Sequence, residues 1–262
     1  MDLDLTGWHA LVCGASQGIG RACAIELARL GADVTVLARR ADVLRQVAAA
    51  LPQVHAGQSH DSIATDSGDT GALRATVTAL AGTHPIHILV NNSGGPAPGP
   101  VHGAAVDNFI AACRQHLVAN HVLAECVIPG MQAAGHGRIV NIISTSVKEP
   151  IPGLGVSNAT RWAVAGWAKT LARELGPFGI TVNNVLPGYT RTPRIEQIVA
   201  ARAQKSGAGL DATQRAMLTD VPVARFAEPS EIAAAVAFLC SPAAAYITGI
   251  NLPVDGGRTR SL

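Results

Sequence analysis

The chain is poor in aromatic and in charged residues. Aromatic residues make up 3% of its 262 residues and charged residues 15%, whereas hydrophobic residues reach 48%. So few aromatic side chains exclude a base-stacking platform for single-stranded nucleic acid. The high apolar content and the low charge exclude an intrinsically disordered chain. The core of a folded domain must therefore be built from Ala, Val, Leu and Ile.

A disulfide pattern, a block of like charge and a long apolar run are also lacking. The five cysteines are odd in number and none is spaced as Cys-x-x-Cys, which is typical of free thiols in a reducing compartment. The net charge is only +2, so neither nucleic acid nor a membrane surface is expected as a partner. The longest apolar run, residues 232–240, is about half the ~20 residues of a membrane-spanning helix. The first residues lack a signal-peptide pattern, and the scattered histidines predict no metal site. We expect a cytoplasmic protein.

Short apolar segments alternate with longer amphipathic ones along the chain. Strands are expected at residues 10–13, 34–37, 62–64, 86–90, 139–143, 181–185 and 249–254. Helices are expected at residues 19–30, 43–51, 70–80, 106–131, 159–175 and 230–240. This alternation requires right-handed crossovers and a parallel sheet with helices on both faces. The sequence therefore predicts one α/β domain, in which the charged segment 188–218 forms a mobile substrate lid of short helices.

A glycine-rich loop follows the first expected strand. Gly14, Gly18 and Gly20 lie between this strand and the first expected helix. Glycines let the backbone turn tightly and approach a pyrophosphate, whose charge is attracted by the N-terminal amides of the helix. The spacing G-x-x-x-G-x-G differs from the G-x-G-x-x-G dinucleotide fingerprint, but its place between strand and helix favours a nucleotide site over a plain turn.

Four motifs in register resemble the short-chain dehydrogenase/reductase family. They are the glycine loop, Asn-Asn-Ser-Gly at residues 91–94, Pro-Gly at 187–188 and Val-Asp-Gly-Gly at 254–257. The resemblance extends from about Leu5 to the C-terminus. It implies a Rossmann-type, doubly wound sheet of seven parallel strands, a nicotinamide cofactor and a homotetramer. The helices expected at 106–131 and 159–175 would pack across one interface of the tetramer, and residues 258–262 would join a second.

The resemblance also implies which residues bind the cofactor. Arg39 follows the second expected strand, where NADP-preferring relatives place an arginine and NAD enzymes an acid. NADP(H) is therefore expected in preference to NAD(H), although Gln17 is not basic as in many NADP enzymes. Asp66 matches the residue that contacts adenine, with Asp61 as the alternative, and Thr192 matches the residue that meets the nicotinamide amide. The expected cofactor-binding residues are Gly14, Ser16, Gln17, Gly18, Ile19, Gly20, Arg39, Arg40, Asp66, Asn92, Ser93, Gly94, Arg161, Pro187, Gly188, Thr190 and Thr192.

The catalytic positions depart from the family pattern. The family uses a serine after the fifth strand, a Tyr-x-x-x-Lys on the next helix and an upstream asparagine. Here the serine is Ser144, while Ser157 and Arg161 stand at the tyrosine and lysine positions and His116 at the asparagine position. A serine hydroxyl has a pKa far above the roughly 10 of tyrosine, so it cannot act as the same acid or base. Arginine stays charged, so it can hold ribose or a developing alkoxide but not relay a proton readily.

Another residue must then supply the proton, and Tyr189 and His116 are the candidates. Tyr189 follows the Pro-Gly motif, where the nicotinamide should lie, and an imidazole has a suitable pKa near 6.5. Each also has a structural alternative: Tyr189 can pack in the lid, His116 can be a hydrogen-bonded core residue, Arg161 can form a buried ion pair and Ser157 can cap its helix.

The sequence is compatible with three functions. The favoured one is an NADP(H)-dependent oxidoreductase that acts on a small carbonyl compound or alcohol with an altered proton path. The second is a non-redox enzyme on the same scaffold, and the third a catalytically silent cofactor-binding protein. Arg191, Arg194 and Lys148 near the expected mouth of the site are candidates for attracting a substrate anion, with solvation as the simpler explanation.

Overall fold

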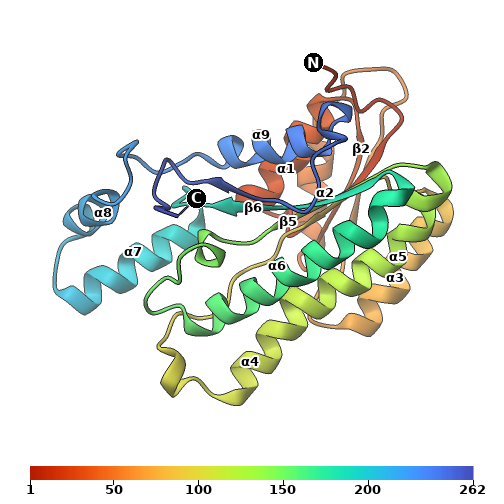
Figure 1. Ribbon diagram of the computed structural model, residues 1–262. Coiled ribbons are helices and arrows are strands. Elements are labelled where there is room, and N and C mark those ends of the chain that lie inside the picture. The colour runs from red at the N-terminus through yellow and green to blue at the C-terminus, as the bar shows by residue number, and fades with distance from the viewer. Residues whose placement is uncertain (262) are drawn as a thin grey trace.

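Seven apolar segments form the strands of one parallel sheet (Figure 1). The computed structural model describes residues 1–261. Its strands are β1 (His9–Cys13), β2 (Asp33–Ala38), β3 (His60–Ala64), β4 (Ile88–Asn91), β5 (Gly137–Ile142), β6 (Ile180–Pro187) and β7 (Asn251–Val254). They are ordered β3-β2-β1-β4-β5-β6-β7 and every neighbouring pair is parallel. The predicted doubly wound, seven-stranded α/β domain is confirmed.

Helices cover both faces of the sheet, as Figure 1 shows. One face carries α1 (Gly18–Arg29), α2 (Ala41–Ala49) and α9 (Pro229–Cys240), and the other carries α3 (Thr70–Thr83), α5 (Ala119–Ala134) and α6 (Gly155–Leu175). Adjacent residues of β1 pack on opposite faces of the sheet: Val12 packs with the core beneath α1, α2 and α9, and Leu11 with the core beneath α3, α5 and α6. Burial on both faces explains why the strands read as continuous apolar runs. Within residues 1–261, no helix combines the length and the apolar character that crossing a membrane requires.

The single helix expected over residues 106–131 is interrupted. Helix α4 (Val106–Cys113) passes into a π-helical turn at Arg114–Val118, which leads into α5. His116 lies in this turn and is buried. A π-turn inserts an extra residue into the helical ladder and is frequent at functional sites. His116 therefore faces the interior from within this interruption. The sequence is amphipathic throughout this segment and does not predict the break.

The chain reverses its direction of travel across the sheet between β1 and β4. These two strands are neighbours, although β2 and β3 lie between them in the sequence. In open α/β sheets, ligands bind outside the carboxyl ends of the strands at such a switch point. The segment 188–218 contains α7 (Pro193–Ser206) and α8 (Leu210–Leu218), which lie beyond the carboxyl end of β6 in Figure 1.

Three buried asparagines and one partly buried asparagine form a hydrogen-bonded ladder across β4, β5, β6 and β7. Asn91 Nδ2 donates to Asn141 Oδ1 at 2.8 Å, Asn141 Nδ2 to Asn184 Oδ1 at 2.9 Å, and Asn184 Nδ2 to Asn251 Oδ1 at 2.8 Å. Each pair is in register on neighbouring strands from β4 to β7. Asn141 and Asn184 each donate and accept, so their amides are paired without water, while Asn91 Oδ1 has no partner. The ladder ties four strands together and lies near the carboxyl ends of β4 and β5 and at the first residue of β7.

Candidate active site

A cavity of about 920 Å³ opens at the carboxyl ends of the strands. Ligand sites span about 300–1,000 Å³, so this one is of a size for more than one small molecule. The cavity brings together nearly all of the predicted site residues. Those that line it are Gly14, Ser16, Gln17, Gly18, Ile19, Arg39, Arg40, Asp66, Asn92, Ser93, Gly94, Ser144, Ser157, Arg161, Pro187, Gly188, Tyr189, Thr190 and Thr192. Gly20, Asp61 and His116 lie outside its lining.

The glycine loop packs directly against the residue that follows β4. A Cβ atom on Gly14 would lie 2.6 Å from Asn92 Nδ2, and one on Gly20 would lie 2.7 Å from the same atom. Gly14 also has φ near +60°, which disfavours any side chain. Asn92 Nδ2 donates to the carbonyl oxygens of Cys13 and Gly14, each at 3.3 Å. Gly20 therefore serves the loop by close packing, while the N-terminus of α1 remains open toward the cavity.

Two arginines and one carboxylate line the far end of the cavity, beyond β2 and β3. Arg39 and Arg40 are exposed, and Arg40 donates to Gln17 Oε1 at 3.4 Å. Neither arginine forms an ion pair with an acid of residues 1–261. Asp66 lines the cavity while Asp61 does not, so the structure favours Asp66 for contact with a ligand here.

Ser144, Ser157 and Arg161 meet at the other end of the cavity. Ser144 follows β5, and Ser157 and Arg161 are four residues apart on α6 and so share one face of it. Because α6 begins at Gly155, Ser157 lies inside the helix and is not its N-cap. These three side chains can contact one bound molecule together.

The Arg161 guanidinium is buried without an acid partner. The residue is 8% exposed, and one Nη donates to the Ile142 carbonyl at 3.1 Å, while Nε has no partner. Burial, with the charge of Arg194 as a second cause, lowers the pKa of Arg161 to about 10. It therefore stays protonated at neutral pH. The structural alternative of a buried ion pair is excluded for the residues that the structure describes, and the free donor is available to a ligand.

His116 and Tyr189, the two candidate proton donors, have different positions. His116 Nδ1 lies 2.7 Å from Ser93 Oγ, behind the cavity wall, and its Nε2 has no partner. Burial lowers the pKa of His116 to about 3, so its imidazole is neutral at physiological pH. Tyr189 lines the cavity itself. The only other tyrosine, Tyr246, is fully exposed and outside the lining.

The buried, neutral state of His116 predicts a pH dependence of folding stability. Its pKa in the folded protein lies below the ~6.5 of an unfolded chain, so the unfolded state takes up the proton first as pH falls. Burial of the neutral His116 therefore leaves the free energy of unfolding almost unchanged above pH 6.5 and lowers it by about 2 kcal/mol at pH 5. We expect the free energy of unfolding, measured with urea at pH 7 and pH 5, to fall less in His116→Asn than in the unmodified protein. Equal losses in both would contradict this prediction.

Arg258 is a cavity residue that the sequence did not single out. It follows the Val-Asp-Gly-Gly motif directly, and its guanidinium lies 4.8 Å from the centre of the Tyr189 ring. One Nη donates to Thr145 Oγ1 at 3.4 Å, and its buried Nε has no partner. The family resemblance places residues 258–262 at a subunit interface, which stays a prediction, and Leu262 lies outside the described residues. The only feature of the sequence that could have indicated a role for Arg258 in the site is its position directly after the Val-Asp-Gly-Gly motif.

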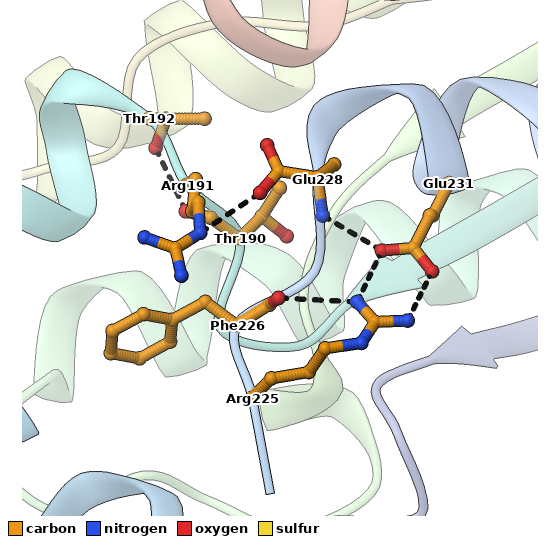
Figure 2. A network of polar contacts seen from close by, with 7 residues as sticks. All are labelled: Thr190, Arg191, Thr192, Arg225, Phe226, Glu228 and Glu231. Carbon is orange, nitrogen blue, oxygen red and sulfur yellow. Dashed lines mark hydrogen bonds and ion pairs between the residues drawn. The ribbon is translucent and has the colours of Figure 1, made fainter. Parts of the chain in front are cut away.

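Arg191 lies outside the cavity lining and is paired with an acid of the protein. Figure 2 shows its Nε facing Glu228 Oε1, at 2.9 Å. Arg225 lies in the loop that also holds Glu228, just before α9, and it donates two hydrogen bonds of 2.6 and 2.7 Å to the Glu231 carboxylate. The Arg191–Glu228 pair attaches the segment after β6 to the start of α9, and the Arg225–Glu231 pair fixes the loop that leads into this helix. Of the arginines near the mouth, Arg191 is therefore not free to attract a substrate anion.

Comparison with known proteins agrees with this geometry. Residues 14–259 match the model of a family described as enoyl-(acyl carrier protein) reductase. The chain is 34% identical to the 3-oxoacyl-[acyl-carrier-protein] reductase FabG of Vibrio harveyi over 97% of this chain and 98% of that one. It is 32% identical to a cyclohexanol dehydrogenase of a Rhodococcus species over 99% of each.

A solved structure shares the fold throughout. The L-sorbose reductase of Gluconobacter frateurii, crystallised with NADPH and L-sorbose, superposes with a TM-score of 0.93 at 30% identity, and each chain is covered completely. Among residues 1–261, no cluster of three or more histidine, cysteine or acidic side chains could hold a metal ion. The chain belongs to the short-chain dehydrogenase/reductase family of oxidoreductases.

Proposed function

We propose that the protein is an NADP(H)-dependent oxidoreductase that reduces a carbonyl group, or oxidises an alcohol, of a small molecule. The observation that carries this proposal is the continuous cavity from Arg39 through the glycine loop to Ser144 and Arg161. Three features fit a dinucleotide: the glycine loop that lines the cavity at Gly14 and Gly18, the N-terminus of α1 beside it, and the unpartnered donor of Arg161. When bound, the cofactor supplies or accepts the hydride.

The residues of this chain would divide the remaining tasks. Arg39 and Arg40 would hold the 2′-phosphate, and Asp66 the adenine. Thr192 lines the same cavity and would face the nicotinamide amide. Ser144 Oγ would donate to the carbonyl oxygen and orient it. Arg161, charged and short of an acceptor, would hold the ribose and steady the alkoxide as it forms.

The proton path is the step that departs from the family. The Ser157 hydroxyl is too weak an acid to protonate an alkoxide efficiently at neutral pH. We assign that role to Tyr189, because Tyr189 lines the cavity while His116 lies behind Ser93. In the reducing direction, the Tyr189 hydroxyl would give its proton to the carbonyl oxygen of the substrate as the bound cofactor supplied the hydride, and solvent would reprotonate the phenolate. Segment 188–218 would exclude water as a lid.

Fluorescence titration with NADPH and NADH, followed by turnover assays on a carbonyl panel, tests the proposal. Binding of either cofactor together with turnover of one carbonyl compound supports it. Failure of both cofactors to bind would contradict it.

Removing Arg39 should abolish the preference for NADPH. Loss of a charge-assisted pair with the 2′-phosphate costs roughly 1.5–3 kcal/mol, so Arg39→Ala should weaken NADPH binding by roughly 10- to 150-fold. NADH affinity should not change, because NADH lacks this phosphate. Arg45→Ala on the exposed side of α2 removes an equal charge outside the cavity and serves as the control. Equal affinity of the unmodified protein for NADH and NADPH would contradict the prediction.

We further propose a homotetramer. Large apolar side chains are exposed on the helical segment 106–118 and on α6: Val106 at 72%, Ile110 at 52% and Trp162 at 51%. Adjacent exposed apolar side chains mark a surface that another subunit covers. Light scattering should give about four times the 26.8 kDa of one chain. Ile110→Glu should lower this mass, whereas Tyr246→Glu, at an exposed side chain on another part of the surface, should not. A monomeric mass at micromolar concentration would overturn the proposal.

A further inference from the structure

The charge of the cavity is unbalanced. Five arginines but only one acidic residue, Asp66, line it. Arg39, Arg40 and Asp66 lie together at the end assigned above to the adenine and the 2′-phosphate. Arg161, Arg194 and Arg258 lie at the end that holds Ser144. No acid of residues 1–261 forms an ion pair with any of these three arginines. The reaction end therefore carries three positive charges that the described protein does not neutralise.

Three separate parts of the chain deliver these charges. Arg161 comes from α6, Arg194 from the start of α7, and Arg258 from the loop after β7. The Nη2 atoms of Arg161 and Arg194 lie 3.9 Å and 4.0 Å from the position that a Cβ on Gly95 would take, so both approach the same space. Like charges brought together and partly buried cost stability unless an anion joins them. Such an arrangement is expected at a site for an anion.

The protein holds Arg194 and Arg258 in place without satisfying them. Arg194 Nη2 donates to the Pro96 carbonyl at 2.7 Å. Arg258 stacks over the Tyr189 ring, and its single side-chain hydrogen bond is with the neutral Thr145 hydroxyl, next to Ser144. Arg258 Nε is buried without a partner. Asp255, the acid nearest in sequence, accepts instead from the backbone amides of Gly257 and Thr259. A guanidinium has five donors, so most remain available to a ligand.

We propose that the substrate bears a carboxylate, which Arg258 and Arg194 bind beside the reacting carbon. This inference deepens the proposed function and rests on it for the identity of the reacting group. Arg161 is left to the ribose and the alkoxide. The substrate class is accordingly an oxo acid in the reducing direction and a hydroxy acid in the oxidising direction. Arginine suits a carboxylate because its planar fork matches the two oxygens.

The test compares acids with their uncharged, isosteric amides. Pyruvate, acetoacetate and 4-oxopentanoate place the carboxylate one, two and three bonds from the carbonyl carbon, and pyruvamide, acetoacetamide and 4-oxopentanamide lack only the charge. Affinity is measured by ligand-detected NMR with and without saturating NADP⁺, and turnover is measured with NADPH. We expect at least one acid to bind and react 10- to 100-fold better than its amide. Equal or better performance of all three amides would overturn the proposal.

Variants then locate the charge. Arg258→Gln and Arg194→Gln should each remove most of the preference for the acid and leave affinity for the amide and for NADPH within about twofold. Arg191→Gln removes an arginine that Glu228 already neutralises, so it should keep the preference. If Arg258→Gln and Arg194→Gln instead weaken NADPH and spare the acid, the arginines serve the cofactor and the proposal is wrong. NADPH affinity of the unmodified protein is measured separately, so failure of the proposed function is distinguished from failure of this inference.

Discussion

The double variant Ser157→Tyr/Arg161→Lys should turn over simple ketones and aldehydes about 10²- to 10⁴-fold faster than the unmodified protein. General acid catalysis contributes a factor of this size, and the double variant would restore a phenol beside a lysine. Both positions line the cavity next to Ser144, and the two side chains share one face of α6. The unmodified protein should bind cofactor well and reduce generic carbonyl compounds weakly or not at all.

A matched control separates the hydroxyl from the added ring. Ser157→Phe/Arg161→Lys places the same bulk in the cavity without a proton to give, so it should show no gain in kcat. In the unmodified protein, Tyr189→Phe should reduce turnover of the native substrate, because we assign the proton to this phenol. Fast reduction of simple ketones by the unmodified protein, unaffected by Tyr189→Phe and by His116→Ala, would show that the proposed proton path is wrong.

The outcome also distinguishes the three functions that the sequence left open. A gain in the double variant shows that the scaffold places hydride donor and carbonyl correctly and that only the proton path was altered. Cofactor binding without any turnover, in the unmodified protein and in the double variant alike, would favour a silent cofactor-binding protein. Reaction of a carbonyl compound without oxidation or reduction of the cofactor would favour the non-redox enzyme.

The sheet and the glycine loop could be predicted because their signals are local. Each strand carries its own run of apolar residues, and burial on both faces makes that run continuous. Gly14 is needed for its positive φ and Gly20 for close packing, and both requirements follow from the turn between a strand and a helix. The carboxyl-end position of the site follows from strand order alone.

Other features depend on contacts between distant segments and have no local signal. Arg258 reaches Tyr189 only because β7 pairs with β6 and brings the C-terminal loop beside the Pro-Gly motif. The π-turn at His116 interrupts a segment that is amphipathic throughout, so the helical periodicity of the sequence does not predict the turn. The asparagine ladder could not be predicted. An asparagine within an apolar strand indicates that its amide has a hydrogen-bond partner, but the sequence does not indicate on which strand that partner lies.

Replacing Asn141 with alanine should cost about 2–6 kcal/mol of folding stability. Asn141 occupies a central position of the ladder, where it accepts from Asn91 and donates to Asn184. Its removal leaves one buried donor and one buried acceptor without partners, and each such group costs about 1–3 kcal/mol. Urea denaturation, monitored by circular dichroism at pH 7, measures the loss.

Asn251→Ala provides the graded comparison, because Asn251 ends the ladder, is less buried and gives up a single hydrogen bond from Asn184. Its cost should be about half that of Asn141→Ala or less. Equal costs would show that the ladder does not act as a connected unit. Three of the strands that it joins are followed within two residues by Ser93, Ser144 and Gly188, which line the cavity. Asn141→Ala should therefore weaken NADPH binding at temperatures where it remains folded, because the carboxyl ends of β4 and β5 are no longer held in register beneath the cavity.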